Sequence, residues 1–161
     1  MKPTDVVYLT KARLVEIEND LIELKTSGRK QIAEKISEAR SHGDLSENAE
    51  YDAAKEAQGH LELKIGKLET MLSRVKIISP DDMPTNEVYI LSVVKILDMK
   101  IKEESVYTLV SPEEADFEQD KISVTSPIGK ALLGKKKNEV IEVEVPAGLL
   151  KYKILEISKL N

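Results

Sequence analysis

Two long helical patterns of similar length, separated by a short acidic stretch, constrain the first half of this chain. In each pattern, apolar residues recur at alternating spacings of three and four, which is typical of a coiled-coil seam. The first seam begins with Leu14, Ile17, Leu21 and Leu24, weakens around residues 26–28 and resumes with Ile32, Ile36 and Ala39. The second comprises Leu61, Ile65, Leu68, Leu72 and Val75. Two such helices with a short connection must pair antiparallel, so the first half is predicted to be a helical hairpin.

The stretch between the two patterns, residues 41–52, is where the chain should reverse. The pair His42-Gly43 is unfavourable in a helix, because glycine costs about 1 kcal/mol relative to alanine. The first helix should therefore end near Arg40 and the second should begin near Leu45. Four carboxylates lie in this stretch with no Lys or Arg among them, and they are Asp44, Glu47, Glu50 and Asp52. The sequence thus predicts an acidic cluster at the far end of the hairpin.

Small residues should let the two helices approach closely near the turn. Ala49, Ala53 and Ala57 are predicted to point inward there. Gly28 and Gly59 lie almost equally far from the turn, which predicts a close approach or a soft bend at that height. The alternative is that they are two unrelated surface glycines.

The pattern changes after residues 79–84, where two prolines flank an Asp pair and indicate a linker. Ser126 and Pro127 form a good helix start, which predicts a short helix over residues 127–133 that stops at Gly134. Strands are predicted at residues 88–97 (one long strand or two short ones), 105–110, 122–124, 140–145 and 149–157, the last two as a hairpin. The second half is therefore predicted to be a small α+β domain, in which one short helix closes the apolar face of an antiparallel sheet.

The composition excludes several classes of function. The chain of 161 residues has no Cys, which excludes thiolate chemistry and a disulfide framework and fits a reducing cytoplasm. The start of the chain lacks an apolar signal core, and no apolar run approaches the roughly 18 residues of a membrane span. A net charge of −5 argues against a protein that coats nucleic acid. Any contact with RNA or DNA should therefore be local or made through a partner.

The spacing of Asp44 and Glu47 has two interpretations. The pair fits a capping-box variant, with Asp44 at the N-cap of the second helix and Glu47 at its third position. The same spacing around a helix start also directs two carboxylates toward one end of the hairpin, where they could hold a metal ion. The two roles can coexist, because a capping carboxylate still presents a free oxygen.

Two parts of the sequence resemble the GreA/GreB family of bacterial transcript cleavage factors. Residues 43–51 read Gly-Asp-Leu-Ser-Glu-Asn-Ala-Glu-Tyr and match the family's hairpin tip, while residues 126–135 and 140–148 resemble its C-terminal domain. The resemblance implies a coiled-coil hairpin over residues 1–79, with its tip at about 41–47. It also implies an FKBP-like domain over residues 80–161 that docks on bacterial RNA polymerase. Such a hairpin enters the polymerase's secondary channel and stimulates the polymerase to cleave backtracked RNA.

The resemblance also implies roles for single residues. Asp44 and Glu47 would complete a second Mg²⁺ site only inside the polymerase, which supplies the other ligands, and Ser46 could position the water or the RNA end. Arg40 and Lys55 would bind the nascent RNA 3′ segment through its phosphates, although they also fit ordinary solvated helix charges. We expect a cytoplasmic monomer that binds no Mg²⁺ alone and is not a nuclease by itself.

The chain departs from the family pattern at two places. Family members often carry a proline after a basic residue in the first helix, where this chain has Arg29-Lys30-Gln31. A glycine expected in the strands before Val110 is missing, so the docking surface could differ in detail.

Single residues near the tip leave further alternatives open. His42 could act as a base, but a lone loop histidine is more often a surface residue. Tyr51 could face a catalytic centre or pack on the hairpin, and we favour packing. The participation of Glu50 and Asp52 is not decided by the sequence.

Three competing functions remain open at this point. An anti-cleavage homologue would share the shape but inhibit, and the retained Asp44 and Glu47 argue against it. A peptidyl-prolyl isomerase would need an aromatic-lined pocket, for which the second half offers Tyr89, Tyr107, Phe117 and Tyr152. A plain coiled-coil scaffold would explain the seam but not the acidic stretch.

Overall fold

The computed structural model describes residues 5–43 and 48–160, which form two compact units. Residues 12–74 make up a helical unit. The residues before and after them make up a sheet unit, so the helical unit is an insertion between two parts of the sheet unit. Within the described residues, no helix combines the length and apolarity needed to cross a membrane.

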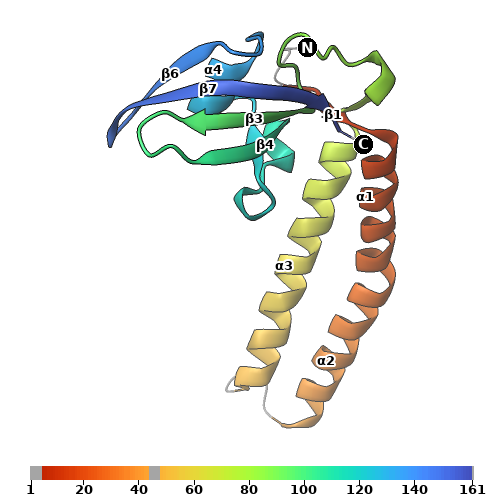
Figure 1. Cartoon of the computed structure of the whole chain (residues 1–161). Helices are drawn as coiled ribbons and strands as arrows, with labels where there is room; N and C mark the ends of the chain where they lie inside the picture. The colour runs from red at the N-terminus through yellow and green to blue at the C-terminus, as the bar shows by residue number, and fades with distance from the viewer. Residues whose placement is uncertain (1–4, 44–47, 161) are drawn as a thin grey trace. The chain divides into compact units, whose positions relative to one another are not determined.

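The helical unit is the predicted antiparallel hairpin (Figure 1). Its first arm consists of α1 (Lys11–Glu23), a five-residue π-helical turn η2 (Leu24–Gly28) and α2 (Arg29–Ser41), and its second arm is α3 (Ala49–Leu72). The predicted start of the second helix near Leu45 was wrong. Asn48 has an extended backbone and caps α3, so Asp44 is not the N-cap of this helix.

The apolar seam of the hairpin is confirmed. The fully buried apolar side chains of the two arms fall on the predicted periodicity or one turn from it, and they are Ile17, Ala39, Ala54, Ile65 and Met71. The prediction for the small residues was wrong in part, because Ala49 and Ala53 are exposed and Ala54 is the buried alanine. Ala54 lies seven residues before Leu61, so the heptad of the outer seam simply continues toward the turn.

The two glycines of the hairpin behave differently. A Cβ atom on Gly28 would lie 3.3 Å from Cδ1 of Leu61, so the arms approach closely there. Gly28 also ends the π-helical turn η2, a local widening of the helix by one residue. A Cβ atom on Gly59 would meet nothing within 4 Å. The predicted close approach is therefore confirmed for Gly28, whereas Gly59 is an open surface position.

The sheet unit contains a five-stranded sheet in the order β5-β4-β3-β7-β6 and a separate parallel pair, β1 (Val7–Leu9) with β2 (Val75–Ile77). The larger sheet consists of β3 (Ser92–Asp98), β4 (Glu104–Val110), β5 (Lys121–Ser123), β6 (Val140–Val145) and β7 (Gly148–Lys159). It is antiparallel except for the pair β4 and β5, which runs parallel. The predicted hairpin of the last two strands is confirmed.

The core of the sheet unit lies between the sheet and α4 (Pro127–Leu132), as predicted. Ser126 caps α4 by accepting a hydrogen bond from the backbone N–H of Gly129. Leu132 packs with Ile96 of β3 and Ile154 of β7 in one buried cluster. These contacts explain why the short helix is stable, because six residues alone would not hold a helix in water.

Two predictions about the start of the sheet unit were wrong. Residues 88–97 form neither one long strand nor two short ones, because Leu91 adopts a positive φ of 69° and the single strand in this range, β3, begins only at Ser92. Residues 79–84 are not a free linker either. They contain a 3-10 turn at Pro80–Asp82, and the side chain of Met83 is buried against Leu91 and Val110.

Candidate site at the tip of the hairpin

Asn48 joins the two arms of the hairpin at its tip. Its side-chain Oδ1 accepts a hydrogen bond from the backbone N–H of Tyr51 at 3.1 Å, which caps α3. Its Nδ2 donates to the backbone carbonyl of Ala39 in α2 at 2.5 Å. One side chain therefore satisfies groups at the end of one helix and at the start of the next. This role of Asn48 was not predicted from the sequence, although an Asn directly before an acidic first helical turn is a recognisable N-cap signal.

A second contact across the tip joins Arg40 to Tyr51. The guanidinium carbon of Arg40 lies 5.9 Å from the centre of the Tyr51 ring, within the range of a cation–π interaction. Tyr51 is half-buried, which confirms that it packs on the hairpin. Lys55 follows Tyr51 by one helical turn, on the same side of α3. Both cationic residues are exposed, and the Nζ of Lys55 donates to Oε1 of Gln58 at 2.8 Å.

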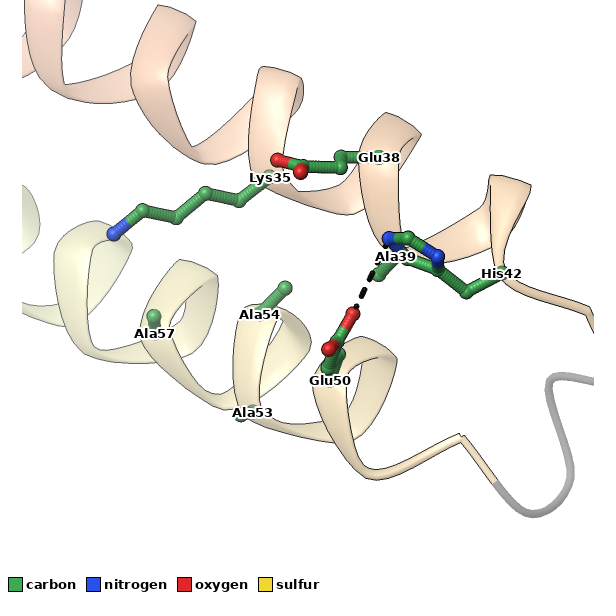
Figure 2. A pocket seen from close by; sticks show the side chains of 8 residues that line it. All are labelled: Lys35, Glu38, Ala39, His42, Glu50, Ala53, Ala54 and Ala57. Carbon is green, nitrogen blue, oxygen red and sulfur yellow. Dashed lines mark ion pairs between the residues drawn. The ribbon is translucent and has the colours of Figure 1, made fainter.

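A third contact pairs His42 with Glu50. The Nε2 atom of His42 lies 3.5 Å from Oε2 of Glu50, and both side chains remain more than half exposed. Figure 2 shows these two side chains facing each other at one end of an open groove of about 580 Å³ between α2 and α3. The groove is lined by Lys35, Glu38, Ala39, His42, Glu50, Ala53, Ala54 and Ala57. Glu50 therefore has a side-chain partner on α2, whereas Asp52 is exposed in the first turn of α3.

The remaining predicted site residues, Asp44, Ser46 and Glu47, lie outside the described residues. The three contacts described above are made by residues directly on either side of them. Carboxylate oxygens are the ligands that Mg²⁺ prefers, so the chemistry of this donor pair fits that ion. Across residues 5–43 and 48–160, no group of three or more acidic, His or Cys side chains could hold a metal ion.

The aromatic residues of the sheet unit that the structure describes differ widely in burial. Tyr107 and Tyr152 pack against the buried core, and burial raises the pKa of the Tyr152 hydroxyl above its ordinary value of 10.0. Phe117 is 82% exposed and Tyr89 is 45% exposed. A cavity of about 240 Å³ on the sheet is lined by Val93, Lys95, Val106, Glu156 and Ser158, with no aromatic residue. This arrangement does not favour a prolyl isomerase.

Comparison with known proteins gives matches along almost the whole chain. Residues 7–77 match the family model described as "Transcription elongation factor, N-terminal". Residues 83–159 match "Transcription elongation factor, GreA/GreB, C-term". The gap between the two matched ranges contains the 3-10 turn at Pro80–Asp82.

Individual relatives agree with the family models. The chain is 52% identical over 154 residues to transcription elongation factor GreA of Chloroherpeton thalassium, covering 96% of this chain and 98% of the relative. It is 53% identical over 153 residues to GreA of Amoebophilus asiaticus, covering 95% and 98%. Among solved structures, GreA factor homolog 1 of Thermus thermophilus is 28% identical, with a TM-score of 0.45 and coverage of 94% and 98%. The assignment of this chain to a protein family therefore rests on the sequence matches.

Proposed function

Since this chain belongs to the GreA/GreB family of transcription elongation factors, we propose that it stimulates RNA polymerase to cleave backtracked nascent RNA. The observation that carries the proposal is the hairpin tip. Its two helix ends are joined by three side-chain contacts, and the chain between them carries Asp44 and Glu47. A slim pair of helices with such a tip is suited to entering the secondary channel and delivering carboxylates to the polymerase's active centre.

Asp44 and Glu47 supply the chemistry in this proposal. Together with carboxylates of the polymerase and the RNA phosphate, they would hold a Mg²⁺ ion that neither partner binds well alone. Mg²⁺ in such a position lowers the pKa of an attacking water and stabilises charge on the phosphate. The hydroxyl of Ser46 positions the water or the RNA end by hydrogen bonding. The protein by itself is then no nuclease, because it contributes only part of a site.

Arg40 and Lys55 bind the RNA 3′ segment through its phosphates in this proposal. The placement of the exposed Arg40 over the half-buried ring of Tyr51 supports it, with Lys55 one helical turn farther along α3, because an exposed cation beside an aromatic ring suits single-stranded RNA. With a net charge of −5, the protein has no general affinity for nucleic acid, so this contact is local. We further propose that the protein acts as a monomer in the cytoplasm, with the sheet unit docking on the rim of the channel.

A pair of variants at the tip tests the proposal. The assay adds the protein and Mg²⁺ to a backtracked polymerase complex and follows the length of the RNA, with a photo-crosslinkable nucleotide at the RNA 3′ end. Asp44→Asn should lower the cleavage rate by about 100-fold or more, because it removes a charged metal ligand, while crosslinking to the protein persists. Lys55→Glu should reduce crosslinking, because it reverses the charge that faces the phosphates.

Asp44→Asn serves as the control for Lys55→Glu in the crosslinking measurement, since it should retain the crosslink that Lys55→Glu loses. Unchanged cleavage with Asp44→Asn would exclude the metal role, and unchanged crosslinking with Lys55→Glu would exclude the RNA contact. Inhibition of cleavage by the wild-type protein would instead identify an anti-cleavage factor.

A further inference from the structure

The side chain of Asn48 uses both of its polar ends on different helices. Oδ1 accepts from the N–H of Tyr51 in α3, and Nδ2 donates to the carbonyl of Ala39 in α2. The orientation of the amide is determined by its partners, because a backbone N–H can only donate and a carbonyl can only accept. Ala39 is buried, so the second bond lies between the arms and not on the surface.

The carbonyl of Ala39 lies in the last turn of α2, which ends at Ser41. It also accepts a hydrogen bond from the backbone N–H of His42, which is the C-cap residue of α2. At the other end, the carbonyl of Asn48 accepts from the backbone N–H of Asp52, the first complete turn of α3. The amide of Asn48 therefore connects the last closed turn of one helix to the first closed turn of the other.

No other common N-cap residue could make both bonds. Asp would cap α3 equally well but would turn a carboxylate oxygen toward the Ala39 carbonyl, with no hydrogen to donate. Ser would also cap α3, but its shorter side chain would not reach across to α2. Asn is thus required by the bond between the helices and not by the cap alone.

We propose that Asn48 is a positioning residue for transcript cleavage. It holds the end of α2 and the start of α3 at a fixed separation, and so fixes both ends of the chain segment that contains Asp44 and Glu47. This inference rests on the proposed function, because it concerns the delivery of those carboxylates. Asn48 itself touches neither metal nor RNA in the proposal. It acts on the reaction through the placement of its sequence neighbours.

The experiment compares Asn48→Asp and Asn48→Ser with Arg29→Gln. The first two variants keep the N-cap and lose the bond between the helices. Arg29→Gln removes a different link between the arms, the ion pair of Arg29 with Glu62, at 2.9 Å and far from the tip. Cleavage rates are measured against Mg²⁺ concentration at saturating protein, and binding to the polymerase is measured by competition with the wild type.

We expect both Asn48 variants to need about 3- to 10-fold more Mg²⁺ for half-maximal cleavage, because the carboxylates are less well placed. Their binding to the polymerase should stay within about 2-fold of the wild type, and Arg29→Gln should change neither quantity. An Asn48→Asp protein with the wild-type Mg²⁺ dependence would overturn the proposal. Equal effects of Asn48→Ser and Arg29→Gln would also overturn it, because they would indicate general loosening of the hairpin.

Amide hydrogen exchange in the free protein gives a second readout that does not need the polymerase. Loss of the bond between the helices should speed amide exchange by several-fold at His42, the C-cap residue of α2. Loss of the N-cap alone would speed exchange only in the first turn of α3. Unchanged exchange at His42 in Asn48→Asp would exclude the link. A wild-type protein that does not stimulate cleavage would overturn the proposed function, while the exchange data would still decide whether Asn48 connects the helices.

Discussion

Gly129 has no room for a side chain. It is buried in α4, and a Cβ atom on it would overlap the backbone carbonyl of Ser123 at the end of β5. The hydroxyl of Ser126 lies between the same groups, since it accepts from the N–H of Gly129 and donates to the carbonyl of Ser123. Only glycine lets the helix approach the strand this closely.

Replacing Gly129 by Ala should therefore destabilise the protein. We expect the free energy of unfolding to fall by about 1–3 kcal/mol, because the obstacle is backbone and not a flexible side chain. Chemical denaturation followed by circular dichroism measures this change. Gly66→Ala is the matched control, since Gly66 is exposed in α3 with nothing within 4 Å of a new Cβ atom. It should raise stability by about 0.5–1 kcal/mol, and a loss at Gly66 would contradict the argument.

The roles of single residues could be predicted from the sequence where their partners are near in the chain. The cap of α4 by Ser126 was predictable, because its partner Gly129 is three residues away. The bond from Asn48 to Ala39 spans nine residues and depends on how two helices meet, so no local pattern reveals it. The positive φ of Leu91 was equally unpredictable, because it follows from tertiary packing and not from local preference.

At the scale of elements, the seam of the hairpin was predictable, because apolar residues in a heptad repeat form a stripe along the helix that faces a partner helix. The π-helical turn η2 was not predicted, although the seam residues Leu24 and Ile32 lie eight positions apart, one more than a heptad, as an extra residue in the helix requires. The strand β1 was missed because three residues give no periodicity. Its assignment depends on pairing with β2, more than sixty positions later in the chain.

Charged pairs supplement the seam at the height of η2. Arg29 donates from Nε and from a terminal nitrogen to the two carboxylate oxygens of Glu62 in α3, at 2.9 and 3.0 Å. This bidentate hydrogen bond is the main cause that lowers the pKa of Glu62 below its ordinary value of 4.5. Because the folded-state pKa is lower than that of the unfolded chain, the pair stabilises the hairpin above about pH 4.5 and ceases to do so as pH falls through the folded value.

The titration of Glu62 tests this pairing. Carboxyl chemical shifts recorded against pH should place the pKa of Glu62 below 4.5 in the wild type and should show a higher pKa in Arg29→Gln than in the wild type. The stability difference between the two proteins should be small above pH 5, because the pair is exposed, and should vanish toward pH 2. An unchanged Glu62 titration in Arg29→Gln would show that the bidentate geometry does not persist in solution.

At the scale of the whole molecule, the division of the chain into two compact units differs from the predicted division at residue 79. The first strand precedes the helices in sequence but belongs to the sheet unit, so the chain leaves that unit after Lys11 and returns to it at Val75. β1 is attached there by its parallel pairing with β2 and by the bond from the N–H of Tyr8 to the buried hydroxyl of Ser111, at 2.9 Å. Both ends of the inserted hairpin are therefore held by one short parallel sheet.

Leu9→Ala tests this division of the chain. Leu9 is 1% exposed, so the substitution should lower the stability of the sheet unit by about 2–5 kcal/mol, the usual cost of emptying a buried leucine site. Amide hydrogen exchange can separate the units, and protection should fall in β3 and β7. Ile101→Ala, at a position that is 58% exposed, is the control and should change stability by less than about 0.5 kcal/mol. If Leu9→Ala lowered protection only in α1 and α3, the first strand would belong to the hairpin, and the predicted boundary at residue 79 would describe the molecule better than the insertion does.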